Sequence, residues 1–344
     1  MAGKTGKTVC FGEIMLRLSP PGYERFVQTG SFDAGYAGGE ANVAVSLANF
    51  GYDSYFVTKV PRHEIGQAAV NRLRSYGVCT RYVARGGERL GIYFLETGAS
   101  QRPSKVVYDR ANSAISQVAP GEFDWDTILD GADWFHFTGI TPALGAGPVA
   151  VTMEAVKMAR AKGIKVSADL NYRKKLWSSE EANRVMSGLM EYVNVAIGNE
   201  EDAEMVFGIK AADSDVTAGS INWAGYQGVA KQLMTRFKLE KVAITLRESL
   251  SASDNNWSAM LYDGQEFHFS RQYKIHIVDR VGGGDSFAAG LIHALLAGKT
   301  SVQAVEFAAA ASCLKHSIFG DFNLVAEAEV EALAGGDASG RVQR

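Results

Sequence analysis

Apolar and polar positions along the chain follow two alternating periods for most of its length. Short apolar runs such as "TVCFG" (8–12), "SYFVTKV" (54–60) and "NVAIGN" (194–199) are typical of buried strands. Longer amphipathic runs such as "EANVAVSLANFG" (40–51) and "PVAVTMEAVKMARAKG" (148–163) are typical of helices that end at a glycine. Strands that alternate with helices predict parallel βαβ units. The pattern therefore predicts an α/β fold, a three-layer sandwich with helices on both faces of a mainly parallel sheet.

Two regions break this alternation. Residues 14–37 and 88–112 contain successive strand-like pieces with no helix between them, namely "MLRLS", "FDAGYA", "GIYFLE" and "SKVVYDR". We interpret them as a small separate β-sheet, a candidate lid inserted in a main domain of residues 1–335. Ordinary edge strands of the main sheet are the alternative. Residues 336–344 are expected to form a disordered tail.

Composition narrows the class of protein. The chain has 344 residues, 47% of them hydrophobic, which is enough for a large buried core. Its 35 basic and 38 acidic residues give a net charge of −3, which argues against a nucleic-acid partner. The three cysteines are far apart and favour neither disulfides nor a thiolate metal site. No apolar run is long enough to span a bilayer and no signal-peptide pattern opens the chain, so we expect a soluble cytoplasmic protein without a membrane partner.

The stretch "DRVGGGDSFAAG" (279–290) carries the strongest candidate chemistry. A helix N-terminus offers unpaired N–H groups and a positive dipole end, and glycines let that backbone approach a ligand closely. Gly282, Gly283 and Gly284 therefore form a candidate anion cradle. Asp285 would repel a bound phosphate, but its position is suitable for a general base that deprotonates a hydroxyl attacking that phosphate. From these residues alone, a simple N-cap role for Asp285 remains an equal alternative.

Two other nucleotide-binding motifs are excluded by their spacing. "GKT" occurs at 298–300, but a P-loop needs glycine five positions before Gly298, where the chain has His293. No G-x-G-x-x-G sequence opens the first strand–helix unit, so a nicotinamide-dependent oxidoreductase is disfavoured.

Residues 279–291, "DRVGGGDSFAAGL", resemble the D-T-x-G-A-G-D signature of the PfkB/ribokinase family of sugar kinases. A second stretch, "YAGGEANVAVSLANFG" (36–51), resembles the N-terminal G-G-x-x-x-N signature of the family, with its asparagine one place earlier. Two motifs about 240 residues apart, in the right order, are far more specific than either alone. The resemblance implies a ribokinase-like fold, ATP and Mg²⁺ as cofactors, and a homodimer or higher homo-oligomer.

The resemblance also implies roles for individual residues. Asp285 matches the catalytic base, and the three glycines 282–284 match the anion hole, with Gly282 and Gly284 also touching the nucleotide. Within the family, "FGEIMLRLSPP" (11–21), "DLNYRKKLW" (169–177) and "CLKHSIFGDFNL" (313–324) are most similar to kinases of the sugar acid 2-keto-3-deoxygluconate. This similarity implies phosphorylation of that acid to 2-keto-3-deoxy-6-phosphogluconate. The matching substrate contacts are Gly38, Gly39, Asn42, Tyr93, Tyr108, Arg110, Arg173 and Asp321.

The chain departs from the family pattern in its nucleotide and metal segments. Asn199 and Thr245 match nucleotide contacts, but Arg247 replaces an expected glycine after Thr245 and could instead reach a phosphate. Asp202 stands where a metal-organising glutamate is expected, with Glu200 and Glu201 as alternatives. The loop around Asp279 often helps to hold a monovalent cation in such kinases, yet threonine is replaced there by Arg280, and we do not predict one here.

An anionic substrate is favoured by two arginines in the segments expected at the ligand. Arg173 follows a predicted strand at its carboxyl end, and Arg110 ends a strand of the small sheet. A guanidinium matches a carboxylate with paired hydrogen bonds. Surface salt bridges are the alternative for either arginine. Kinases of a neutral sugar such as fructose or ribose, and a sugar-acid-binding protein without catalysis, remain competing functions.

Overall fold

The computed structural model describes residues 6–199, 201–211, 223–337 and 340. Its main sheet has ten strands in the described part of the chain, in the order β13-β12-β11-β10-β9-β8-β1-β4-β5, with β14 paired to β12. The parallel strands are β1 (Lys7–Phe11), β4 (Asp53–Val60), β5 (Val83–Arg85), β8 (Trp134–Thr138), β9 (Lys165–Asp169), β10 (Val195–Asn199) and β11 (Lys241–Ser249). The antiparallel edge consists of β12 (Asp254–Tyr262), β13 (Phe267–Phe269) and β14 (Tyr273–His276).

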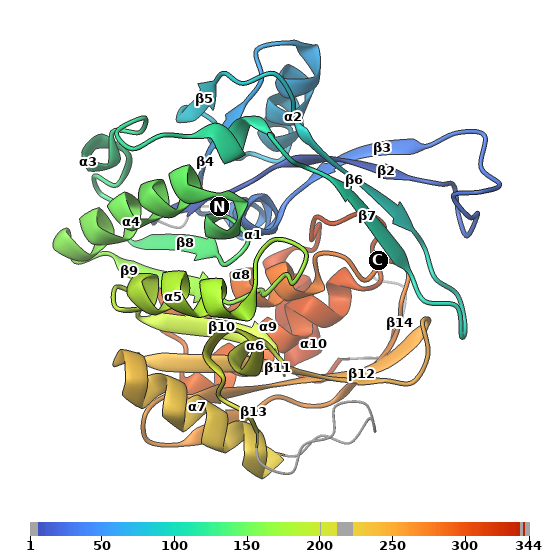
Figure 1. The fold of residues 1–344 in the computed structure, drawn as a ribbon. Coiled ribbons are helices and arrows are strands. Elements are labelled where there is room, and N and C mark those ends of the chain that lie inside the picture. The colour runs from blue at the N-terminus through green and yellow to red at the C-terminus, as the bar shows by residue number, and fades with distance from the viewer. Residues whose placement is uncertain (1–5, 200, 212–222, 338–339, 341–344) are drawn as a thin grey trace.

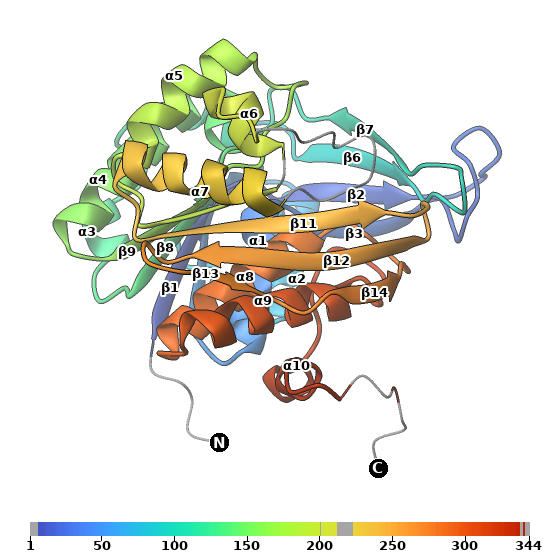
Figure 2. The same cartoon turned by 90° about the horizontal axis from the view of Figure 1, so that it is seen from below.

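Helices cover both faces of this sheet (Figures 1 and 2). One face carries α3 (Trp125–Ile128), α4 (Ala146–Ala161), α5 (Ser179–Met190), α6 (Asp202–Phe207) and α7 (Trp223–Phe237). The other face carries α1 (Gly39–Asn49), α2 (Glu64–Arg74), α8 (Gly283–Leu296), α9 (Ser301–Lys315) and α10 (Glu327–Ala334). Each face has its own apolar core, and the central strand β8 is buried along its whole length. The predicted three-layer α/β sandwich is thereby confirmed.

A second sheet is separate from the first, as the two breaks in the alternation predicted. Its order is β3-β2-β6-β7, with β2 (Met15–Ser19), β3 (Asp33–Ala37), β6 (Gly91–Glu96) and β7 (Lys105–Asp109). β2 pairs in parallel with β6, and the two outer pairs are antiparallel. The alternative of extra edge strands on the main sheet is wrong, because no strand of this group pairs with the main sheet among the described residues.

The chain enters the small sheet directly after the carboxyl end of β1, and β6 follows a loop from β5. The carboxyl ends of β1, β8, β9, β10 and β11 lie on one edge of the main sheet because these strands are parallel. Open α/β sheets bind ligands at this edge. The small sheet therefore begins where a ligand is expected, and Figure 1 shows it extending from that side of the main body. Of the expected tail, residues 338–339 and 341–344 lie outside the described part of the chain.

Candidate active site

The glycine run forms the turn into α8, and the three glycines are required for different reasons. Gly282 has a φ of 86°, and a Cβ there would lie 2.0 Å from the backbone oxygen of Asp321. A Cβ on Gly283 would lie 2.5 Å from the ring of His316. Gly284 is exposed, and no heavy atom lies within 4 Å of its Cβ position. The first two glycines are thus fixed by packing, whereas the third leaves open space at the N-terminus of α8, as an anion cradle requires.

Asp285 lies in the first turn of α8 and is half-buried. Its Oδ2 accepts a hydrogen bond of 2.7 Å from Nδ2 of Asn42, which lies on α1. A Cβ on Gly39 would be 3.5 Å from Oδ1 of Asp285. The structure therefore brings the two predicted motifs together, 243 residues apart. Gly38 is buried beneath them, with no room for a Cβ against the backbone oxygen of Glu13.

Burial raises the pKa of Asp285 from 3.8 to about 6. The hydrogen bond from Asn42 opposes this shift, the charge of Asp321 adds to it, and the positive charges of Arg173 and Lys315 oppose it. A carboxylate with a raised pKa is a stronger base than an ordinary aspartate and is still ionised at neutral pH. The environment of Asp285 is thus suited to deprotonating a hydroxyl.

This pKa gives a testable pH dependence. Because only the ionised carboxylate can accept a proton, kcat/KM should rise with pH up to about 6 and level off above it. An aspartate with its ordinary pKa of 3.8 would keep kcat/KM nearly constant down to about pH 5. The check is a kcat/KM profile over the range in which thermal melts show folded protein. A profile that stays flat down to about pH 4.5 would contradict this assignment.

A buried ion-pair network joins the small sheet to the glycine turn. Arg17 of β2 binds the carboxylates of Asp279, at 2.5 Å, and Asp321, and its Nε donates to Ser19 Oγ at 3.0 Å. The hydroxyl of Tyr93 on β6 donates to Oδ2 of Asp321 at 2.7 Å. Two expected sugar contacts, Tyr93 and Asp321, therefore bind each other in this structure. Sequence reasoning missed Arg17, although strand alternation in "MLRLS" places its side chain on the inward face with Met15 and Ser19.

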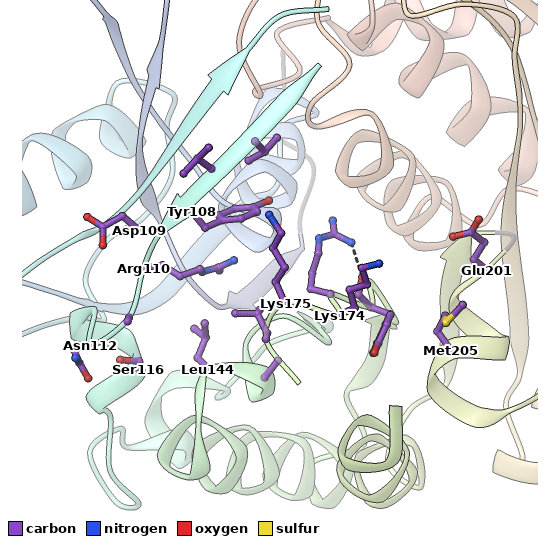
Figure 3. Close-up of a pocket in the computed structure, with 17 residues that line it drawn as sticks. Tyr108, Asp109, Arg110, Asn112, Ser116, Leu144, Lys174, Lys175, Glu201 and Met205 are labelled. Carbon is purple, nitrogen blue, oxygen red and sulfur yellow. Dashed lines mark hydrogen bonds between the residues drawn. The ribbon is translucent and has the colours of Figure 1, made fainter. Parts of the chain in front are cut away.

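A cavity of about 960 Å³ lies between β7 and the loops that follow β9 and β7. Its lining includes three of the expected substrate contacts, Tyr108, Arg110 and Arg173. It also includes two lysines that sequence reasoning did not single out, Lys174 and Lys175. Figure 3 shows Tyr108, Arg110 and Lys175 pointing toward one another across the cavity. Asp285, Gly39 and Asn42 are not part of this lining.

The two arginines of the cavity differ in how their charges are satisfied. Arg110 is buried and pairs with Glu13, whose carboxylate accepts from Nε at 2.9 Å and from Nη2, and from Ser113 Oγ at 2.8 Å. Arg173 donates only to the backbone oxygen of Tyr172, at 2.9 Å, and forms no ion pair with a described residue. Its charge nevertheless lowers the pKa of Asp285, which links the cavity to the glycine turn. Arg173 is therefore the guanidinium that can accept an anionic group.

The nucleotide and metal candidates lie at the carboxyl edge of the main sheet. Asn199 ends β10 and is paired in register with Thr245 of β11. Asp202 is buried, and its two oxygens accept the backbone N–H groups of Tyr172 at 3.0 Å and Asn199 at 2.9 Å. No group of three or more metal-ligating side chains occurs among the described residues. A carboxylate already held by two N–H groups fits a contact to Mg²⁺ through water better than direct ligation.

Other charged residues near this edge of the sheet differ in how deeply they are buried. Asp169, which sequence reasoning missed, ends β9, and burial together with the charges of Asp202 and Asp285 raises its pKa. Arg247 is exposed and close enough to Arg280 to lower its pKa. Burial is the larger cause of the lowered pKa of Arg280, and the charge of the Asp279 carboxylate opposes both effects. Glu201, an alternative to Asp202, is exposed, and Glu200 lies outside the described residues.

Comparisons with known proteins identify the family of this chain. The profile of the pfkB family carbohydrate kinases matches residues 5–321. The 2-dehydro-3-deoxygalactonokinase of Haloferax volcanii is 33% identical over 97% of this chain and 98% of its own. The 2-dehydro-3-deoxygluconokinase of Bacillus subtilis is 27% identical over 92% of this chain and 91% of its own. No helix among the described residues is long and apolar enough to cross a membrane.

Solved structures show the same relationship at the level of the fold. The crystal structure of 2-dehydro-3-deoxygluconokinase from Thermotoga maritima is 54% identical, with a TM-score of 0.94, and the match covers 98% of this chain and 100% of that chain. A putative 2-keto-3-deoxygluconate kinase from Enterococcus faecalis is 28% identical with a TM-score of 0.90, covering 98% and 99%. The family profile spans both motifs of the site and all the described strands of the main sheet. The chain therefore belongs to the pfkB family and is a carbohydrate kinase.

Proposed function

We propose that this kinase transfers the γ-phosphoryl group of ATP to the terminal hydroxyl of 2-keto-3-deoxygluconate. The product is 2-keto-3-deoxy-6-phosphogluconate. The observation that carries the proposal is the unpaired guanidinium of Arg173, which lines a large cavity and whose charge reaches Asp285. A guanidinium without a carboxylate partner favours an anionic substrate over a neutral sugar. The 54% identity to a 2-dehydro-3-deoxygluconokinase supports the same substrate.

In the proposed mechanism, Asp285 accepts the proton of the sugar hydroxyl as the oxygen attacks the γ-phosphorus. Asn42 holds the Oδ2 atom of Asp285, and Oδ1, which lies near Gly39, would accept the proton. The N–H groups at residues 282–284 would stabilise charge on the transferred phosphoryl group. Bound Mg²⁺ would neutralise phosphate charge, and Asp202 would hold its water ligands. Asn199, Thr245 and Arg247 would contact the nucleotide.

Closure of the small sheet would keep water from competing with the sugar hydroxyl. Tyr108 lies on β7 at the cavity, and Tyr93 and Arg17 already tie β6 and β2 to the segments around the glycine turn. A lid formed by this sheet would carry Tyr93 and Tyr108 with it when it moves.

We also propose that the protein is a cytoplasmic homodimer. Sedimentation in solution tests the dimer directly.

Substitution of Arg173 tests the carboxylate assignment. Arg173→Ala should raise KM for the sugar acid by about 100-fold because a charge-assisted pair is lost, while KM for any neutral sugar accepted by the enzyme changes little. Arg173→Lys keeps the charge but loses the bidentate geometry and should fall between the two. The measurement is ADP release with each sugar over a range of concentrations. Equal effects of Arg173→Ala on acid and neutral sugars would remove the argument for a bound carboxylate.

The epimer 2-keto-3-deoxygalactonate is the second candidate substrate, since a 33% identical relative is named for that activity. The two acids share the carboxylate, so Arg173 cannot discriminate between them. A panel of both acids with fructose and ribose ranks the candidates by kcat/KM. A preference for a neutral sugar would refute the proposed substrate class. Binding of ATP and sugar without turnover would instead favour the binding-protein alternative.

A further inference from the structure

Lys315 is a fully buried cation that the proposed mechanism leaves without a role. It is the last residue of α9, and its side chain has no exposed surface. Its Nζ donates to the backbone oxygens of Asp279, at 3.1 Å, and Ile318, at 3.2 Å. Lysines are almost never fully buried unless they are paired, because the charged group loses its hydration. The burial of the Lys315 ammonium among backbone carbonyls therefore requires an explanation.

The two segments that Lys315 joins are the ones that pack around the glycine turn. Asp279 precedes the turn, and its carboxylate accepts the N–H groups of Val281 and Gly320, each at 3.1 Å. The segment after α9 leads to Asp321, whose backbone oxygen lies against Gly282. The ammonium of Lys315 thus joins the carbonyl of Asp279, before the turn, to the carbonyl of Ile318 in the segment that leads to Asp321.

The charges around the turn are balanced when Lys315 is counted. The carboxylates of Asp279 and Asp321 face the guanidinium of Arg17 and the ammonium of Lys315, and both carboxylates act on Lys315 electrostatically. Asp285 also acts on Lys315, and Asp279 also acts on Arg280, so three carboxylates and three cations lie around the turn. A further cation in this region would add an unpaired charge in a site of low dielectric, which is unfavourable.

We propose that the ammonium of Lys315 is a built-in cation that holds residues 279–284 in the shape that receives the phosphoryl group, so that the enzyme needs no monovalent metal ion. The family resemblance raised such an ion around the loop of Asp279, where Arg280 in place of threonine argued against it. Here the charge is covalently attached and bonded to that loop through the Asp279 carbonyl. Lys315 is a positioning residue in this proposal, which rests on the proposed phosphoryl transfer at Asp285 but not on the identity of the sugar.

The first test uses the wild-type enzyme and needs no substitution. Potassium is replaced by tetramethylammonium at constant ionic strength, which leaves screening unchanged while removing any cation that could enter a buried site. The rate with the best sugar of the panel should change by less than about twofold, because screening is constant. Activation by potassium or sodium of more than about tenfold would overturn the proposal. If no sugar is turned over, the proposed phosphoryl transfer fails first, which distinguishes the two failures.

The second test removes the charge. Lys315→Met should lower kcat by about 100-fold, since small displacements of reacting groups have effects of this size, while KM for the sugar changes by less than about threefold. Lys299→Met is the matched control, because Lys299 is a lysine paired with Glu331 outside the site, and this variant should keep the wild-type kcat. A wild-type kcat in Lys315→Met would overturn the proposal.

A smaller side chain allows rescue by an external ion. Lys315→Ala leaves a space beside the Asp279 and Ile318 carbonyls, and added potassium or ammonium should raise its kcat about tenfold over tetramethylammonium. A purely structural lysine would give a variant with a lower melting temperature and no ion-specific response, which would count against the proposal. If neither variant folds, the cation response of the wild type decides.

Discussion

Asp285→Asn should lower kcat by about 1,000-fold while KM for the sugar and for ATP stays within about threefold, because only proton acceptance is lost. The carboxamide has nearly the same shape as the carboxylate, and its oxygen can still accept the 2.7 Å bond from Asn42. Burial disfavours the ionised form of Asp285, so loss of that charge should not destabilise the fold. The substitution therefore separates chemistry from binding and folding.

The measurement combines steady-state kinetics with calorimetric binding of ATP and of the sugar. Asp169→Asn is the informative comparison, since Asp169 is a buried carboxyl whose pKa is raised by burial and by the charges of Asp202 and Asp285. If Asp285→Asn retains kcat within about tenfold and Asp169→Asn does not, the base is Asp169 and the proposed mechanism is wrong.

Sequence patterns predicted the features of the structure that depend on a single continuous segment of the chain. Strand–helix alternation predicted the main sheet, and the absence of helices in 14–37 and 88–112 predicted the second sheet. The glycine run and the segment 36–51 each suggested an anion or sugar site, and the structure joins them through Asn42 and Asp285. Both motifs lie at helix N-termini, where backbone geometry is set locally.

The parts that sequence reasoning missed depend on contacts between segments that lie far apart in the chain. Glu13 and Arg110 are 97 residues apart, and Arg17 and Asp321 are 304 apart. Alternation can place Arg17 on the inward face of its strand, but it carries no information about which carboxylates the segments after β14 and α9 present. The same limit applies to Arg110, whose expected carboxylate partner was a substrate and whose partner in the structure is Glu13.

The glycines of the turn allow stability and catalysis to be separated. Gly282→Ala should destabilise the fold by about 2–4 kcal/mol, because a positive φ disfavours a Cβ and the new atom would lie 2.0 Å from the Asp321 oxygen. Gly284→Ala should stabilise the fold slightly instead of destabilising it. Its Cβ meets no heavy atom within 4 Å, and alanine is favoured over glycine in a helix by up to about 1 kcal/mol.

Catalysis should distinguish Gly284→Ala from an ordinary helix substitution. If the transferred phosphoryl group contacts the N-terminus of α8, a methyl group at Gly284 occupies its approach, and kcat should fall by about 100- to 1,000-fold in a protein that is no less stable. Gly228→Ala in α7 is the matched control, because its Cβ also meets nothing within 4 Å, and it should gain similar stability at full activity. Urea unfolding and ADP release measure the two effects. A fully active Gly284→Ala enzyme would mean that the phosphoryl group does not approach α8, and the anion cradle would have to be sought elsewhere on the carboxyl edge.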